Sequence, residues 1–113
     1  MNRGGEEAEL LAASYLEARG LRILQRNYQC RFGEIDLIAQ QGAVVVFVEV
    51  RRRSSDAFGG AAASITQSKR RKLLRTARYY LAGRSPAPPC RFDALLIQGT
   101  PPAIDWIRDA FGE

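Results

Sequence analysis

The stretch from Gly33 to Arg53 reads GEIDLIAQQGAVVVFVEVRRR. It contains two β-branched, apolar runs on either side of a short connection with a glycine, a pattern that predicts a β-hairpin. The second run, residues 44–50, is apolar on both faces of the pleat, so we expect a central strand that is covered on both sides. This hairpin is therefore predicted to lie at the centre of the fold.

Each strand of the predicted hairpin carries a carboxylate, Asp36 on the first and Glu49 on the second. If Gly42-Ala43 forms a two-residue turn, or if the connection is two residues longer, Asp36 faces Glu49 directly, whereas other registers place them on a diagonal or on opposite faces. Arg51 lies two residues beyond Glu49 and projects from the same face. Two adjacent carboxylates repel each other, which favours a divalent cation with hard oxygen ligands.

The length of 113 residues predicts one domain, residues 1–113, with a core of its own. No apolar run is long enough to span a membrane, and no signal-like segment is visible at the N-terminus. Cys30 and Cys90 lack metal-binding spacing and are expected to be reduced thiols. These features predict a cytoplasmic protein without a membrane partner.

Charge and composition limit the kinds of partner and the catalytic groups that are possible for this sequence. Seventeen Lys and Arg residues against twelve Asp and Glu residues give a net charge of +5, which favours a polyanionic partner, with nucleic acid first. The sequence has no histidine, which excludes Ser-His and Cys-His mechanisms and zinc sites with histidine ligands. The groups that remain available for catalysis or binding are carboxylates, amines, guanidinium groups and metal ions.

A helix is predicted over residues 6–19, because apolar side chains recur there at helical spacing on one arc. Glu9 lies at the margin of this arc. It is either a boundary residue with a solvated carboxylate or an acid that leans toward the predicted metal site.

A second helix is predicted over residues 62–82, followed by glycine and a proline-rich segment. Cationic side chains crowd one half of it: Lys69, Arg70, Arg71, Lys72, Arg75 and Arg78. They form either a solvated face or a nucleic-acid-binding surface, on which each phosphate contact adds affinity that salt removes. The adjacent Tyr79 either stacks on an unpaired base or packs within the fold.

Further strands are predicted over residues 21–28, 92–98 and 103–107, and a polar loop over residues 52–60 beside the site. Asp93 follows Arg91, which can neutralise it, so we assign Asp93 a structural role. The predicted order of elements indicates an α/β domain in which helices pack against a mixed sheet.

Several motifs combine across nearly the whole chain: RNY at residues 26–28, GEIDLI at 33–38, FVEVR at 47–51, RFD at 91–93 and DAF at 109–111, together with Glu9 and Lys69. In this combination the sequence resembles the YraN-like family of small bacterial proteins. That family is similar to the restriction-endonuclease-like, or PD-(D/E)XK, superfamily, which includes Holliday-junction resolvases. The resemblance implies a restriction-endonuclease-like fold, with a central mixed β-sheet flanked by α-helices.

The resemblance also implies roles for individual residues. Asp36 takes the place of the first acid of the superfamily, Glu49 that of the second, and Glu9 that of the acid on the leading helix. These three residues would bind Mg²⁺ or Mn²⁺, with the Val50 carbonyl as an extra ligand. Homodimers are common among resolvase-like relatives, although no stretch of this sequence identifies an interface.

Arg51 departs from the pattern, because the superfamily has lysine at this position. That lysine is thought to orient or deprotonate the attacking water and to offset charge on the phosphate. Arginine offsets charge but stays protonated at any working pH. Lys69 on the second helix matches a family lysine and is the candidate substitute.

Three functions follow as hypotheses. The first is a Mg²⁺-dependent endonuclease acting on DNA, by analogy branched or damaged DNA, in which metal-activated water attacks a phosphodiester, Asp36 and Glu49 hold the metal and Arg51 steadies the phosphate. The second is a catalytically inactive nucleic-acid-binding protein that retains the nuclease fold, with Arg51 paired to Glu49 in the place of the metal. The third is a protein-interaction domain whose basic face is only solubilising.

Overall fold

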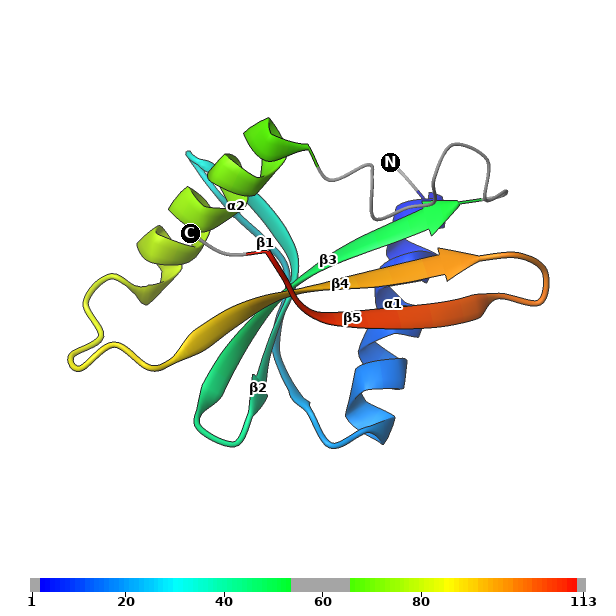
Figure 1. Cartoon of the computed structure of the whole chain (residues 1–113), viewed down its shortest axis with the longest axis horizontal. Helices are drawn as coiled ribbons and strands as arrows, with labels where there is room; N and C mark the ends of the chain where they lie inside the picture. The colour runs from blue at the N-terminus through cyan, green and yellow to red at the C-terminus, as the bar shows by residue number, and fades with distance from the viewer. Residues whose placement is uncertain (1–2, 54–65, 112–113) are drawn as a thin grey trace.

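A computed structural model gives the fold of the chain and describes residues 3–53 and 66–111. The elements, in chain order, are α1 (Arg3–Ala18), β1 (Arg22–Cys30), β2 (Gly33–Gln41), β3 (Val44–Arg53), α2 (Gln67–Leu81), β4 (Cys90–Gln98) and β5 (Ala103–Phe111). Figure 1 shows one strongly twisted sheet with α1 on one side and α2 on the other. Neither helix is long and apolar enough to cross a membrane.

The strands follow the order of the chain, β1-β2-β3-β4-β5, so β3 is the central strand as predicted. The β3–β4 pair is parallel and α2 provides the crossover between them, whereas the other three pairs are antiparallel. Gln41 pairs with Val44, which leaves Gly42 and Ala43 as a two-residue turn, with Gly42 at a positive φ of 60°. The mixed sheet between helices is consistent with the predicted restriction-endonuclease-like fold.

Two apolar layers hold the helices on the sheet. The layer under α1 is built from small residues of the helix and branched residues of the strands: Ala8, Ala12, Leu16, Leu37, Val46, Val48, Leu95 and Ile97. The layer under α2 contains Ile38, Phe47, Leu73, Ala77, Phe92 and Phe111. Since side chains alternate between faces along β3, Phe47 and Glu49 lie on the α2 side, and Val48 lies on the α1 side.

The two central strands separate before β3 ends. The pairing of β2 with β3 extends from the turn to Leu37 opposite Val48, whereas β3 remains paired with β4 as far as Arg53 opposite Gln98. Figure 1 shows the β1–β2 end near α2, while the arrow of β3 runs to the other side of the molecule. The first residues past this fork are Asp36 on β2 and Glu49 on β3.

Some boundaries differ from the prediction. Helix α1 begins three residues earlier than expected, at Arg3, and β5 continues to Phe111. The second helix was predicted over residues 62–82 and so included Thr66, which is wrong. Thr66 is the extended N-cap of α2, and its hydroxyl accepts a hydrogen bond from the Lys69 N–H at 3.2 Å. Residues 62–65, and residues 54–60 of the predicted loop, lie outside the described ranges.

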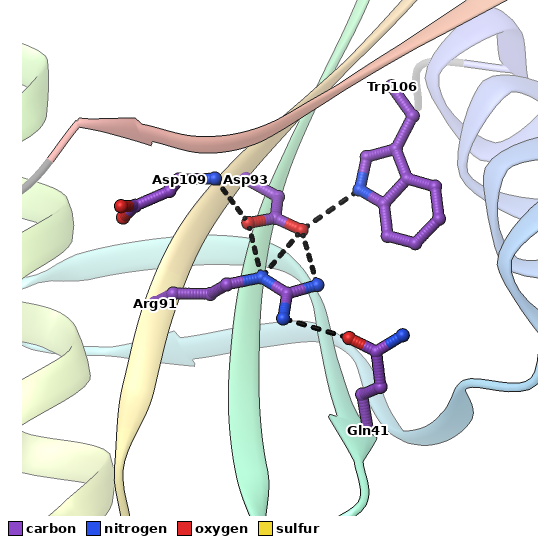
Figure 2. Close-up of polar contacts among 5 residues, drawn as sticks. All are labelled: Gln41, Arg91, Asp93, Trp106 and Asp109. Atoms are coloured by element: carbon purple, nitrogen blue, oxygen red, sulfur yellow. Dashed lines mark hydrogen bonds and ion pairs between the residues drawn. The ribbon is translucent and has the colours of Figure 1, made fainter.

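Asp93 holds β4, β5 and the end of β2 together through a buried polar network (Figure 2). Its fully buried carboxylate accepts hydrogen bonds from Nε of Arg91 at 3.0 Å, from Nε1 of Trp106 at 2.9 Å and from the Asp109 N–H at 2.9 Å. Nη1 of Arg91 also donates to Gln41 at 2.8 Å. The network interrupts the regular β4–β5 register between Phe92 and Ala94, and it confirms the pairing with Arg91 and the structural role predicted for Asp93.

Replacing Asp93 with alanine should therefore strongly destabilise the fold. The variant leaves the N–H donors of Trp106 and Asp109 without their acceptor and removes the countercharge of Arg91. Breaking a buried ion pair from one side costs about 3–5 kcal/mol. We expect that loss in the free energy of unfolding measured with urea. The matched control is Asp105→Ala on an exposed position of β5, which should change it by less than about 0.5 kcal/mol; similar values for the two variants would contradict the role of Asp93.

Candidate active site

Asp36 and Glu49 meet at the fork between β2 and β3. The Glu49 side chain is 4% exposed, and its carboxyl group lies close enough to Asp36 to raise the pKa of that residue. Oδ2 of Asp36 also accepts a hydrogen bond from the Val50 N–H at 2.8 Å. A side-chain oxygen thus replaces the backbone acceptor that β2 no longer supplies to β3. The register predicted from the two-residue turn places the two acids together, as expected.

Burial and the adjacent Glu49 carboxyl make Asp36 a weak acid. Together, with burial the larger cause, they raise the pKa of Asp36 from 3.8 to about 8, while the Val50 N–H acts in the opposite direction. Without an added cation, Asp36 is therefore mostly protonated at neutral pH. Protonation of Asp36 removes one negative charge from the pair.

Two cationic side chains converge on one oxygen of this pair. Nη2 of Arg51 lies 2.8 Å from Oε2 of Glu49, and Nζ of Lys69 lies 2.7 Å from the same atom. Arg51 reaches it from the same face of β3. Lys69 reaches it from the first turn of α2, where it precedes buried Leu73 by four residues and so lies on the helix face turned to the sheet.

These contacts are ion pairs without the directionality of good hydrogen bonds. Oε2 of Glu49 and Nε of Arg51 are both buried and have no hydrogen-bond partner among the residues that the structure describes. Buried polar atoms in this condition are uncommon and point to a ligand that completes the site. A cation beside the carboxylate, or a phosphate beside the guanidinium group, has the matching chemistry.

Glu9 approaches the pair from the opposite layer. It projects from α1, yet its carboxyl group lies close enough to Asp36 to raise the pKa of that residue. Burial and the nearby Glu34 raise the pKa of Glu9, and Arg26 partly offsets them. Of the two interpretations left open by the sequence, this geometry favours the one in which Glu9 leans toward the site.

The acids fit a metal ion only in part. Within residues 3–53 and 66–111, no group of three or more Asp, Glu or Cys side chains is arranged to hold a metal by itself. Asp36 and Glu49 nevertheless supply the hard oxygen donors that Mg²⁺ prefers, and Mg²⁺ commonly takes one or two carboxylates and fills its shell with water and substrate phosphate. The pair fits such a site, and Glu9 remains a predicted third ligand.

The basic residues of α2 divide into three groups. Lys69 and Lys72 border a cavity of about 670 Å³ next to the acid pair. Arg71, Arg75 and Arg78 have exposed side chains at helical spacing on the outer face. Arg70 points elsewhere, with its guanidinium carbon 5.6 Å from the centre of the Phe111 ring.

The cavity itself was not predicted from the sequence. Its lining comes from the end of β1, the start of β2, and the N-cap and first half of α2: Gln29, Cys30, Gly33, Glu34, Thr66, Ser68, Lys69, Lys72 and Leu73. A Cβ atom on Gly33 would lie 3.1 Å from Oγ1 of buried Thr76, and Gly33 has a φ of 149°. This glycine therefore lets α2 approach β2 closely. Glycine at the start of the GEID motif was the available signal.

Comparison with known proteins places the chain in a family. The model of the Uncharacterised protein family UPF0102 matches residues 8–97. The chain belongs to this family. Its relatives include UPF0102 proteins of Nitrosomonas europaea, 59% identical over 96% of this chain and 93% of the relative, and of Methylobacillus flagellatus, 54% identical over 98% of each. A UPF0102 protein of Psychromonas ingrahamii is 48% identical over 99% of this chain and 92% of its own length.

This membership confirms the YraN-like family predicted from the motifs, and the match includes the fork with both acids. Asp36, Glu49, Arg51 and Lys69 all lie within the matched residues of the UPF0102 domain.

The raised pKa of Asp36 makes stability depend on pH. The folded state binds the Asp36 proton more tightly than the unfolded state, so this stabilising contribution is complete below about pH 4 and is lost as pH rises toward 8. Between about pH 5 and about pH 7.5, wild type should lose up to about 3 kcal/mol in the free energy of unfolding relative to Asp36→Asn. Urea titrations at several pH values measure this difference. Parallel pH profiles for the two proteins, with Asp105→Asn as the surface control, would show that Asp36 titrates normally.

Proposed function

We propose that this protein is a Mg²⁺- or Mn²⁺-dependent endonuclease that hydrolyses phosphodiester bonds in DNA, with branched or damaged DNA as the substrate suggested by analogy. The observation that carries the proposal is the Asp36–Glu49 pair, in which Asp36 is half-buried and Glu49 is buried, with Arg51 and Lys69 at 2.8 and 2.7 Å from Glu49. Paired carboxylates with adjacent cations form a site that binds a divalent ion and a phosphate together.

Asp36 and Glu49 would hold the ion, with Glu9 as a further ligand directly or through water. When bound, a divalent cation supplies an activated water and stabilises negative charge on the phosphoryl group. Because Asp36 is mostly protonated near neutral pH, it must release its proton to serve as a ligand. Metal affinity should therefore rise with pH up to about 8.

The two cationic side chains have separate tasks. Arg51 stays protonated, so it neutralises the phosphate and holds it beside the acid pair. Lys69 is close enough to Glu49 to help orient the attacking water, part of the task of the lysine that Arg51 replaces. In the reaction a bond forms between the water oxygen and phosphorus, and the bond from phosphorus to the leaving sugar oxygen breaks. The proton that the attacking water gives up goes to solvent, and the leaving oxygen takes up a proton from solvent.

The acids and Lys69 should be required for cleavage but not for DNA binding. In a gel assay with Mg²⁺ or Mn²⁺ on linear, flapped and four-way DNA, we expect wild type to cut at least one substrate. Asp36→Asn and Glu49→Gln should abolish cutting, and Lys69→Met should slow it by about 10²–10³-fold, the usual effect of removing one transition-state contact. Glu17→Gln, on an exposed position of α1, is the matched control and should cut like wild type. Unchanged cutting by both acid variants would end the proposal.

One observation favours a second candidate, a nucleic-acid-binding protein without catalysis. Arg51 and Lys69 already lie against Oε2 of Glu49, where a metal ion would otherwise bind. In such a protein the cations would balance the carboxylate permanently. Affinity would then come from the exposed arginines of α2.

This candidate has its own test in salt dependence. Each lost phosphate contact reduces the slope of log K against log salt by about 1. Arg71→Glu with Arg75→Glu should flatten the slope by about 2 in fluorescence titrations with duplex DNA, while the same reversal at Arg22, an exposed residue of β1, should change it less. If wild type binds but never cuts, the second candidate stands; if affinity does not depend on salt, the basic face of α2 is not a phosphate surface.

A further inference from the structure

An aromatic pair lies exposed beyond the cavity. The rings of Phe32 and Tyr79 meet edge to face with centroids 5.5 Å apart. Tyr79 remains 48% exposed, and only Leu10 is a comparably exposed large hydrophobic residue in the described parts of the chain. The guanidinium carbons of Arg31 and Arg75 lie 4.9 and 5.9 Å from the centre of the Phe32 ring. Aromatic surface is thus surrounded by positive charge at the protein surface.

The aromatic pair continues a line of cations that starts at the acids. Lys69 touches Glu49, and both Lys69 and Lys72 border the cavity. Lys72, Arg75 and Tyr79 then follow at positions i, i+3 and i+7, which places them along one edge of α2. Phe32 joins this edge from the β1–β2 connection, between the cavity residues Cys30 and Gly33.

The cavity that lies between the acid pair and the Phe32–Tyr79 pair is suited to a phosphate-bearing chain. Two lysines supply positive charge, and Thr66 and Ser68 supply hydroxyl groups at the N-terminus of α2. Glu34 is the acid on this wall, and its carboxylate already accepts a hydrogen bond from Nε2 of Gln29 at 3.2 Å. A strand whose phosphate lies at Glu49 can therefore pass Lys69 and Lys72 and present its next bases to Tyr79.

We propose that Tyr79 and Phe32 form a stacking platform for an unpaired nucleobase, so that the protein selects DNA with a single-stranded segment beside the phosphate to be cut. The inference rests on the proposed function for its nucleic-acid ligand and adds the class of substrate. In a duplex the faces of the bases are covered by their neighbours, and only groove edges and phosphates are accessible. A base must be unpaired to stack on an aromatic side chain, and cations beside the ring hold the adjacent backbone.

The experiment measures binding without metal, so that cleavage plays no part. Fluorescence anisotropy in EDTA compares a short labelled single strand with a blunt duplex of the same sequence. Tyr79→Ala should weaken single-strand binding by about 5- to 100-fold, the effect of losing one base–aromatic stack, and should change duplex affinity by less than about 2-fold. Tyr79→Phe should bind like wild type because it keeps the ring. Leu10→Ala removes the other exposed hydrophobic side chain and should have no effect on either ligand.

A second series changes only the DNA and so does not depend on how a variant folds. An abasic site moved along the single strand should weaken wild-type binding most at one position. The same abasic strand should bind Tyr79→Ala no more weakly than the intact strand does, because the two changes remove one interaction. The platform would be overturned if Tyr79→Ala lost as much affinity for the duplex as for the single strand. It would also be overturned if the affinity of wild type for abasic strands did not depend on the position of the abasic site.

The outcome separates this inference from the nuclease proposal. Base-dependent binding through Tyr79 together with no cleavage under any metal would leave the platform in place and remove the nuclease. Cleavage that requires Asp36 and Glu49 but is indifferent to Tyr79 and to unpaired bases would keep the nuclease and remove the platform.

Discussion

The site depends on a fork in the centre of the sheet. Where β2 leaves β3, the Val50 N–H loses its backbone acceptor, and a buried N–H group without a partner is costly. Asp36 supplies the missing acceptor at 2.8 Å, which brings its carboxylate into the interior beside Glu49. With the two acids side by side there, Asp36 takes up a proton, and Arg51 and Lys69 pair with Glu49. The chemistry of the site follows from this single break in pairing.

The same arrangement opposes stability. Asp36 holds a proton at neutral pH, and two cations share one carboxylate oxygen of Glu49. Removing such charges from water costs free energy, so this cluster does not drive folding. The contrast within the molecule is Asp93, whose carboxylate has aligned donors from Arg91, Trp106 and Asp109. Glu49 and Asp93 are both buried, but Oε2 of Glu49 has no hydrogen-bond partner among the described residues. This incomplete satisfaction is the feature that makes the acid pair the candidate site.

The sequence predicts the parts of this architecture that local rules determine. Gly42 and Ala43 fix the hairpin register, and alternation then places Asp36, Glu49 and Arg51 together; the spacing of Arg91 and Asp93 indicates their pairing. The fork is not predictable in this way, because β2 keeps its β propensity through Gly33–Gln41 while it leaves its neighbour. Nor is the reach of Lys69, which depends on Thr66 capping α2 and on Gly33 admitting Thr76 at close range. Long-range packing decides both features.

Helix α2 links the chemistry to recognition. Lys69, in the first turn of the helix, contacts Glu49 of the acid pair. Lys72, one turn later, borders the cavity, and Tyr79, near the other end, packs against Phe32. A lysine at residue 51 would have kept the amine and Glu49 on one strand. With arginine at residue 51, the amine beside Glu49 comes from α2, so its position relative to Glu49 depends on the packing of α2 over Gly33.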